Sequence, residues 1–305
     1  MIKLQAFRLV FVAQEGIYFP EGHAANILRG AFGTILRKLA CDTECESAVA
    51  CNRRASCAYA MLFEPRSSGA GPSGLRDWPR PFVFRASHLD GKRVDAGGVF
   101  SFDFHLFDLK TRAVSYLIRA FAELAREGLG GGRKRVELMR VEGLCGDGSV
   151  CGVVHSETDA ATIEVPLDGG SGAERRLVVR FVTPTELKSE SRIVSRPEFG
   201  ILAGRIRDRV SVLCELYGDG APGLDFKGFG ERAAAVQMTR CEVRTVEVER
   251  RSSRTAQSHS IGGFVGEAVY EGEVGEFVPW LRAAHWTGVG RQTVWGKGLI
   301  EVDAT

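Results

Sequence analysis

Hydrophobic and polar positions in the first half of the chain follow the two periods that distinguish strands from helices. Residues 2–12 switch from one phase of a period of two, with Ile2 and Leu4, to the other phase at Phe7. This switch indicates a strand with a bulge or with both faces buried. Residues 24–40 carry apolar side chains at intervals of three and four, which predicts an amphipathic helix. The remaining predictions are strands over 81–89 and 98–108, a helix over 112–127 and a strand over 134–142.

The second half repeats the same order of elements. A strand is predicted over 176–182, and apolar residues at helical spacing predict a long helix over 197–217. The later predictions are strands over 240–250 and 262–271, a short helix over 275–284 and a last strand over 298–302. Each half therefore reads β-α-β-β-α-β, which is the ferredoxin-like order of an antiparallel sheet with helices on one face.

The length of 305 residues fits two domains of ordinary size. We expect an α+β protein of two tandem ferredoxin-like, RRM-like domains. The segment 166–174 is rich in Gly, Asp and Ser and is predicted to be the boundary, which gives domains over 1–168 and 169–305. The two halves share an order of elements rather than a visible sequence similarity.

Composition narrows the class of protein. The chain is 44% hydrophobic and 26% charged, as in soluble globular proteins. Its formal net charge of +2 argues against a polycation that coats nucleic acid indiscriminately. Of the 40 basic residues only eight are Lys, and the Arg fork suits phosphate. A GC-rich genome would also favour Arg codons, and composition alone leaves both explanations open.

The N-terminal residues do not have the form of a signal peptide, because charged residues such as Lys3 and Arg8 interrupt them. No apolar run of 18 residues is present, so no membrane span is predicted. We therefore expect a cytoplasmic protein without a membrane partner.

Four of the eight cysteines follow the first predicted helix, at positions Cys41, Cys45, Cys51 and Cys57. Four thiolates in so short a stretch, in a reducing compartment, favour a structural tetrahedral metal site within an insert of the first domain, residues 41–57. Zinc is the default ion, and an iron–sulfur cluster uses the same set of ligands. Unligated cysteines are the alternative, because the spacing is not that of a CxxC knuckle.

The other four cysteines have simpler interpretations. Cys145 and Cys151 flank a Gly-Asp-Gly turn, where the two side chains could face each other across a hairpin. Cys214 and Cys241 are interpreted as core residues.

The sharpest motif is a glycine-rich loop over residues 287–298, in which two GxG units are separated by five residues. Glycines let backbone amides approach a phosphate without a Cβ between them. Arg291 and Lys297 add positive charge, and Trp295 offers a surface on which a base can stack. The loop is neither a Walker loop nor a Rossmann fingerprint, because it lacks the GK[ST] ending and a place between a first strand and helix. A plain turn before a terminal strand is the alternative.

Five stretches in the same order resemble one known family. The loop has the form TGxGxxTxxGxG, and the other four stretches are Leu28–Gly33, Cys57–Glu64, Phe181–Lys188 and Gly262–Tyr270. Together they resemble the CRISPR-associated endoribonucleases that process precursor repeat RNA, within the RAMP superfamily. Only some of those relatives carry the four-cysteine insert.

The resemblance implies a metal-independent RNA cleavage without a catalytic cofactor. A ribose 2′-hydroxyl attacks the adjacent phosphorus and the 5′-oxygen leaves, which gives mature guide RNAs with 2′,3′-cyclic phosphate ends. The protein must hold the attack geometry, move protons and stabilise the developing charge. The implied partners are CRISPR repeat RNA and precursor guide RNA, with other CRISPR effector subunits as further partners.

The resemblance also implies site residues. His23, at the start of the first helix, takes the place of the general base, because a His titrates near neutral pH. Tyr18 orients the substrate or donates a proton, and His285 beside the loop is the second candidate for proton transfer. Packing or capping is the alternative for each of these three. The implied RNA-binding residues are Arg29, Arg37, Arg250, Arg251, Arg254, Gly288, Gly290, Arg291, Trp295, Gly296, Lys297 and Gly298.

Two other functions compete with cleavage. Some RAMP proteins bind the guide RNA handle in an effector complex without cutting it, and such a subunit shares the same fold. An unrelated metal-dependent enzyme would instead use the cysteine cluster, but no His-Glu pair accompanies it, so a metal there is expected to be structural.

Overall fold

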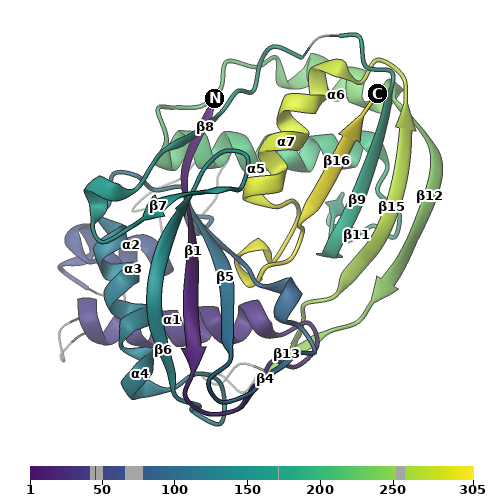
Figure 1. The fold of residues 1–305 in the computed structure, drawn as a ribbon. Helices are drawn as coiled ribbons and strands as arrows, with labels where there is room; N and C mark the ends of the chain where they lie inside the picture. The colour runs from purple at the N-terminus through teal and green to yellow at the C-terminus, as the bar shows by residue number, and fades with distance from the viewer. Residues whose placement is uncertain (42–44, 46–50, 66–77, 171, 252–257) are drawn as a thin grey trace. The chain divides into compact units, whose positions relative to one another are not determined.

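The computed structural model describes residues 1–41, 45, 51–65, 78–170, 172–251 and 258–305. The chain forms two compact units (Figure 1). The N-terminal unit comprises Lys3–Ile163, and the C-terminal unit comprises Glu164–Thr305 together with Met1–Ile2. A short strand, β8 (Ile163–Val165), lies where the chain passes from one unit to the other.

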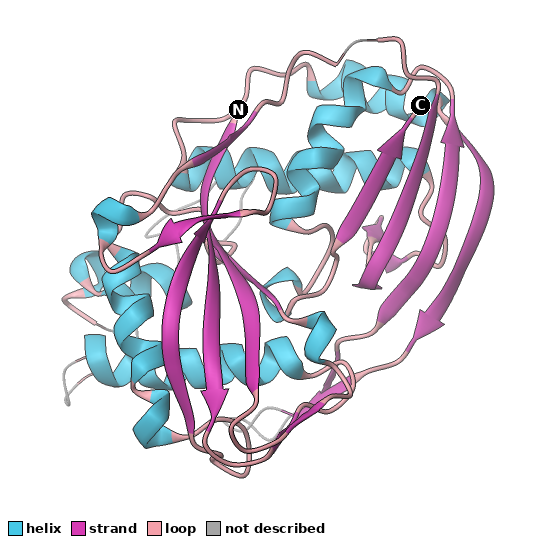
Figure 2. Ribbon diagram, viewed as in Figure 1, coloured by secondary structure: helices cyan, strands magenta, loops and turns pink. Residues whose placement is uncertain are grey.

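The N-terminal unit is built on an antiparallel sheet of order β3-β5-β1-β6-β7 (Figure 2). Its strands are β1 (Ile2–Ala13), β3 (Phe82–Arg85), β5 (Val99–Leu106), β6 (Val136–Leu144) and β7 (Val150–Val153). The first four have the ferredoxin-like arrangement, with the first strand central between the third and the fourth. Both parts of the prediction for the first strand are confirmed. Consecutive residues of β1 are buried, and its pairing with β6 shifts register between Val10 and Phe11.

Helices pack on one face of this sheet through an aromatic core. They are α1 (Ala24–Ala40), α2 (Ala58–Phe63), α3 (Ala113–Ala122) and α4 (Leu124–Glu127). The ring of Phe32 in α1 stacks on Phe121 in α3 at 5.3 Å and meets Phe104 in β5 edge to face at 5.7 Å. Buried aromatic rings of this size contribute about 2–3 kcal/mol each, so these contacts fix the helices on the sheet.

Short elements complete the N-terminal unit. They are β2 (Ile17–Tyr18), β4 (Arg93–Val94) and the 3-10 turns η1 (Arg54–Ser56), η3 (Ser87–Leu89) and η4 (Glu157–Asp159). The predicted strand over 81–89 is thus a strand followed by η3. The predicted helix over 112–127 is divided into two at Glu123, the C-cap of α3 and the N-cap of α4. Cys145 and Cys151 form a disulfide across the hairpin between β6 and β7.

The C-terminal unit has an antiparallel sheet of order β12-β15-β9-β16, which is again the ferredoxin-like order. The strands are β9 (Arg176–Thr185), β12 (Gln237–Val246), β15 (Gly263–Glu271) and β16 (Ile300–Ala304). Two small hairpins, β10 (Lys188–Ser189) with β11 (Arg192–Ile193) and β13 (Glu249–Arg251) with β14 (Ser258–Ser260), extend from it.

Three helices accompany this sheet: α5 (Phe199–Tyr217), α6 (Phe226–Ala235) and α7 (Val278–Thr287). The 3-10 turns η5 (Gly275–Phe277) and η6 (Thr293–Trp295) lie before and after α7. Helix α6 is absent from the sequence prediction, because it is short and has few apolar residues, of which Phe229 and Ala233 are buried. It begins where the Asp225 side chain accepts a hydrogen bond from the Gly228 backbone N–H.

Candidate functional site

The start of α1 brings together residues from two segments of the N-terminal unit. Strands β2 and β4 pair so that Tyr18 lies opposite Arg93. The Tyr18 side chain is half exposed, at 50%, and the Arg93 guanidinium lies 6.0 Å from its ring centroid, in a cation–π arrangement. An aromatic ring and a cation are therefore held next to each other on β2 and β4, and the aromatic residue Tyr18 lies five residues before His23 in the sequence.

His23 is the N-cap residue of α1, but its ring does not cap the helix. The backbone N–H of Ala24 donates instead to the carboxylate of Asp90, at 2.9 Å. The His23 ring is partly exposed, and its Nδ1 lies 3.1 Å from the carbonyl oxygen of Glu21. If Nδ1 donates to that carbonyl, Nε2 is the nitrogen that can accept a proton.

Arg29, one of the residues expected to bind RNA, is buried in the N-terminal unit. The residue is only 7% exposed, and its guanidinium stacks on the ring of Phe63 at 4.5 Å. The reason is α2, which covers the face of α1 that carries Arg29. A Cβ on Gly33 would overlap the Phe63 ring, so Gly33 makes this close approach of α1 and α2 feasible. Arg37 is partly exposed and donates to the Cys45 carbonyl at 3.1 Å.

The glycine-rich loop is held by the protein's own backbone. The Val289 N–H donates to Gly298, the Gly298 N–H donates to Pro184, and the Arg291 N–H donates to Glu186. Gly290 and Gly298 have φ of 77° and 70°, and a Cβ on either would overlap a carbonyl oxygen, of Glu186 and Val289 respectively. These glycines are therefore required by the loop's own fold, independently of any ligand. Gly288 and Gly296 also have positive φ, of 71° and 76°.

The charged residues of this loop are largely committed to the protein. The Arg291 guanidinium forms an ion pair with the Glu186 carboxylate, which is itself buried. Lys297 is only 3% exposed, and Trp295 is partly buried in η6. The expectation that Lys297 presents its charge to RNA is therefore not met in this structure, because the side chain lies inside the unit.

Other predicted site residues lie elsewhere in the C-terminal unit. His285 is in α7, where its Nδ1 lies 3.2 Å from the Ile300 carbonyl oxygen and its ring meets Trp286 edge to face. Arg250 and Arg251 lie in β13. Arg254 lies outside the described residues.

The four cysteines do not form a metal site in this structure. Among the described residues, which include all four, no group of three or more His, Cys, Asp or Glu side chains is arranged to hold a metal ion. The sulfurs of Cys41 and Cys57 lie 4.0 Å apart. Burial, together with Cys57 and Cys45, raises the pKa of the Cys41 thiol to about 12. Because the described residues contain no group of ligands arranged for a metal ion, the predicted zinc or iron–sulfur centre is not supported.

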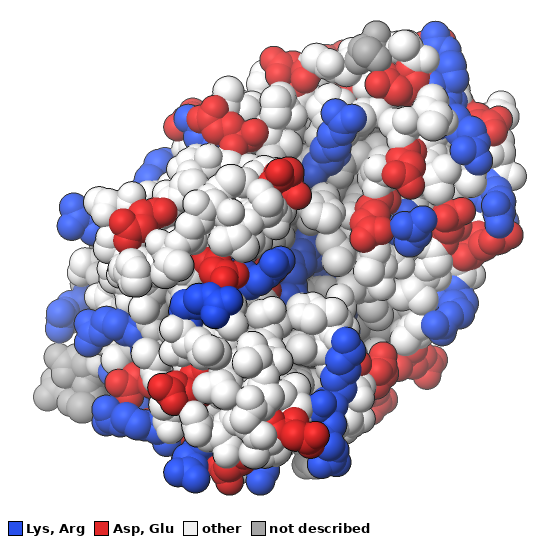
Figure 3. All heavy atoms as spheres, in the orientation of Figure 1, with Lys and Arg blue, Asp and Glu red and all other residues white. Residues whose placement is uncertain are grey.

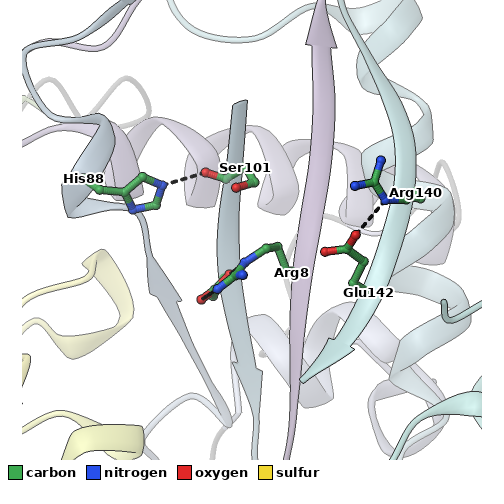
Figure 4. A network of polar contacts seen from close by, with 6 residues as sticks. Arg8, His88, Ser101, Arg140 and Glu142 are labelled. Carbon is green, nitrogen blue, oxygen red and sulfur yellow. Dashed lines mark hydrogen bonds and ion pairs between the residues drawn. The ribbon is translucent and has the colours of Figure 1, made fainter. Parts of the chain in front are cut away.

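The sheet face of the N-terminal unit that points away from the helices is polar (Figure 4). Arg8 in β1 donates through two nitrogens to Asp103 in β5, at 2.8 and 3.0 Å, and Arg140 pairs with Glu142 in β6 at 2.6 Å. The His88 ring in η3 contacts the Ser101 carbonyl at 2.8 Å. Hydrogen bonding to Asp103 raises the pKa of Arg8 further, so this guanidinium stays charged and paired.

The corresponding face of the C-terminal sheet carries a second set of ion pairs. Arg180 in β9 lies between Glu301 in β16, at 2.9 Å, and Glu267 in β15, at 3.8 Å. Arg240 pairs with Glu242 in β12 at 2.6 Å. On the surface in view in Figure 3, basic and acidic side chains are likewise interspersed. RRM domains stack bases on aromatic side chains of this sheet face, whereas Arg180 and Arg240 here place paired charges on it.

None of the helices among the described residues is long and apolar enough to span a membrane.

Comparisons with known proteins address the family directly. Residues 2–164 match a family model named AF_1859_N, an N-terminal domain, and residues 179–300 match the model of the CRISPR-associated endoribonuclease Cas6. No curated protein sequence matches the chain.

Solved structures resemble the whole chain. A Thermus thermophilus Cas6, TTHB231, in a product complex has a TM-score of 0.58 at 19% identity over 99% of this chain and 100% of its own. The product complex of another Cas6, TTHA0078, has a TM-score of 0.52 at 20% identity, with coverage of 99% and 100%. A partial Cas6-RT-Cas1–Cas2 complex has a TM-score of 0.58 at 12% identity over 99% of this chain and 46% of that one. Residues 179–300 thus match the Cas6 family of CRISPR-associated endoribonucleases, and the two ferredoxin-like units of the chain have the fold of solved Cas6 structures.

Proposed function

We propose that the chain is a metal-independent endoribonuclease that cleaves precursor CRISPR RNA within the repeat, with the start of α1 as its catalytic site. The observation that supports this proposal is that Asp90, and not His23, caps α1. Because Asp90 caps the helix, the partly exposed His23 ring at the N-cap position is not needed for capping. The match of residues 179–300 to the Cas6 model supports RNA as the substrate.

In the proposed reaction, His23 accepts the proton of the attacking ribose 2′-hydroxyl. The oxygen then attacks the adjacent phosphorus in line, and the bond to the 5′-oxygen breaks. The products are a 2′,3′-cyclic phosphate and a 5′-hydroxyl, so the leaving oxygen must receive a proton. Tyr18, a half-exposed residue, donates that proton from its hydroxyl, and Arg93 stabilises the negative charge of the phosphorane from beside the ring.

The glycine-rich loop supplies the second part of the proposed site. Its shape is fixed before RNA arrives, because its glycines and backbone hydrogen bonds hold it against the end of β9. A preorganised loop loses little conformational freedom on binding, which favours its use as an RNA contact. We place RNA binding on this loop and on the basic residues of β13.

The deciding experiment is cleavage of a cognate repeat RNA in EDTA, compared with the same RNA carrying a 2′-deoxy nucleotide at the scissile position. The proposal requires cleavage of the first and none of the second. Cleavage of the deoxy RNA would refute the mechanism. Binding of the intact repeat without cleavage would instead assign the non-catalytic role of a RAMP subunit that holds the guide RNA handle.

The residue assignment is tested separately. His23→Ala should lower the single-turnover cleavage rate by about 100-fold or more while RNA affinity changes less than threefold, as expected for the loss of general base catalysis. Tyr18→Phe should lower the rate by a smaller factor. His285→Ala is the matched control, because that ring contacts the Ile300 carbonyl. If His285→Ala, rather than His23→Ala, loses cleavage, the base lies in the C-terminal unit.

Repeat RNA is the primary proposed partner. Other CRISPR proteins are proposed as further partners, since a related Cas6 belongs to a Cas6-RT-Cas1–Cas2 complex.

A further inference from the structure

Arg209 in α5 is a cation placed directly behind the glycine-rich loop. Its Nε donates to the carbonyl oxygen of Thr287 at 2.8 Å. Thr287 is fully buried, ends α7 and is followed at once by Gly288, the first glycine of the loop. Arg209 thus contacts the C-terminal end of α7, where the loop begins.

This guanidinium has no counter-ion among the described residues. No carboxylate lies within ion-pair distance of it, and its Nη2 is out of contact with solvent and has no hydrogen-bond partner. Burial lowers the pKa of Arg209 to about 10, so the group is still cationic at neutral pH. Arg207, two residues earlier, differs in that it pairs with Asp208 at 2.7 Å. Arg209 as a whole is partly exposed, but a charge that is shielded at Nη2 and has one carbonyl partner is costly to keep for stability alone.

A positive charge near the start of the glycine-rich loop would favour the binding of an anion. The carbonyl end of a helix carries a partial negative charge, which repels anions. The loop begins at that end of α7, and the two cations of its own sequence do not offset it freely. Arg291 is paired with the Glu186 carboxylate, and Lys297 is buried. Arg209 faces the repelling end directly.

We propose that Arg209 is a positioning residue that makes the glycine-rich loop able to bind an RNA phosphate, by offsetting the negative end of α7 through the Thr287 carbonyl. The charge acts from a partly buried position, where water screens it less than a fully exposed charge. It holds the start of the loop and biases the local potential towards an anion, without touching RNA itself. This inference rests on the proposed function, because it takes RNA as the anion.

The test compares Arg209→Gln, which keeps an N–H donor and loses the charge, with Arg209→Lys, which keeps the charge. We expect Arg209→Gln to weaken binding of the repeat RNA by about tenfold at 0.1 M salt, the size of a favourable helix-end charge effect, with a smaller dependence of log Kd on log salt. Arg209→Lys should stay within twofold of wild type. Arg207→Gln is the control from the same helix and should leave Kd unchanged.

Three outcomes would overturn the inference. Wild-type affinity and salt dependence in a folded Arg209→Gln variant would show that the charge is not used. Equal loss of affinity in the Lys and Gln variants, together with a lower unfolding midpoint, would show a structural role. If Arg209→Gln does not fold, a tenfold loss in a folded Arg209→Lys variant would also refute the inference.

The proposed function and the inference about Arg209 can fail independently. A wild-type chain that binds no repeat RNA would refute the proposed function and leave the role of Arg209 to be tested. The inference is then tested with inorganic phosphate as the probe. Phosphate binding is measured by tryptophan fluorescence. Wild type and Arg209→Lys should bind phosphate more tightly than Arg209→Gln, and equal phosphate affinities would overturn the inference.

Discussion

The carboxylate of Asp90 accepts a 2.9 Å hydrogen bond from the backbone N–H of Ala24, 66 residues earlier in the sequence. The first N–H groups of a helix lack partners within the helix, and an N-cap side chain normally supplies one. Here Asp90, directly after η3, supplies it, and the His23 side chain makes no cap hydrogen bond. The catalytic candidate and its helix are thus stabilised from a distant segment.

Replacing Asp90 should therefore affect both stability and cleavage. Asp90→Ala removes the acceptor of the Ala24 N–H, so we expect the free energy of unfolding to fall by about 1 kcal/mol, as for other lost helix caps. The start of α1 should fray, and the cleavage rate should fall more than RNA affinity. Asp90→Asn keeps an acceptor and serves as the control in chemical denaturation and single-turnover cleavage. An unchanged cleavage rate in Asp90→Ala would contradict the prediction and show that the helix cap does not affect catalysis.

The glycine-rich loop should tolerate no side chain at position 298. A Cβ on Gly298 would overlap the Val289 carbonyl oxygen, and the positive φ adds strain, so Gly298→Ala must shift the loop. We expect the unfolding midpoint to fall and RNA affinity to drop at least tenfold. Gly204→Ala is the matched control, because nothing lies within 4 Å of a Cβ there and the residue is inside α5. That substitution should be neutral or stabilising by up to about 1 kcal/mol.

The contact between α1 and α2 gives a prediction about coupling. Gly33→Ala places a methyl group against the Phe63 ring, so we expect a loss of about 1–3 kcal/mol in the free energy of unfolding, as in other overpacked cores. In a Phe63→Ala background the same substitution should cost much less, because the ring is gone. The double-mutant cycle, measured by chemical denaturation, should therefore show a clear interaction energy. Additive losses would mean that α1 and α2 do not meet at this point.

Alkaline stability should depend on Cys214. Burial raises the pKa of this thiol to about 11 in the folded chain, whereas an unfolded thiol titrates near ~8.5. Between these values the unfolded chain binds fewer protons, so the stability that Cys214 contributes is present below pH ~8.5 and is lost as the pH rises towards 11. The free energy of unfolding of Cys214→Ala should therefore fall less steeply over this range. Cys241→Ala, from a partly exposed position in β12, is the control, and parallel curves for wild type and Cys214→Ala would contradict the prediction.

Much of the fold follows from periodicity. Strong apolar patterns, such as Phe100 to Phe104 in β5 and the stripe of α1, placed the strands and long helices of both ferredoxin-like units. The misses have local causes. Helix α6 is short and has few apolar residues, and β2 and β4 are two-residue strands that are too short to show a period.

The site was less predictable, because its partners are distant in sequence. No local pattern indicates that Asp90 caps α1, that Arg93 lies over Tyr18, or that Glu186 pairs with Arg291. The burial of Arg29 depends on α2. This helix follows a cysteine-rich stretch, and its sequence gives no sign that it packs against α1. Sequence reasoning located the candidate residues through motifs, whereas tertiary contacts decide which charges remain available. Arg209 shows the same limit, since a single Arg in a predicted helix gives no signal of its place behind a loop.

The ion pairs on the sheet of the C-terminal unit have a thermodynamic consequence for RNA binding. A cation already matched by a neighbouring carboxylate, as Arg180 is by Glu301, gains little from a phosphate and displaces few counter-ions from the nucleic acid. The salt dependence of RNA affinity should then count contacts made outside the sheet face, and Arg180→Gln should leave its slope unchanged. Measuring RNA affinity at several salt concentrations thus distinguishes charges that are paired within the protein from charges that contact RNA.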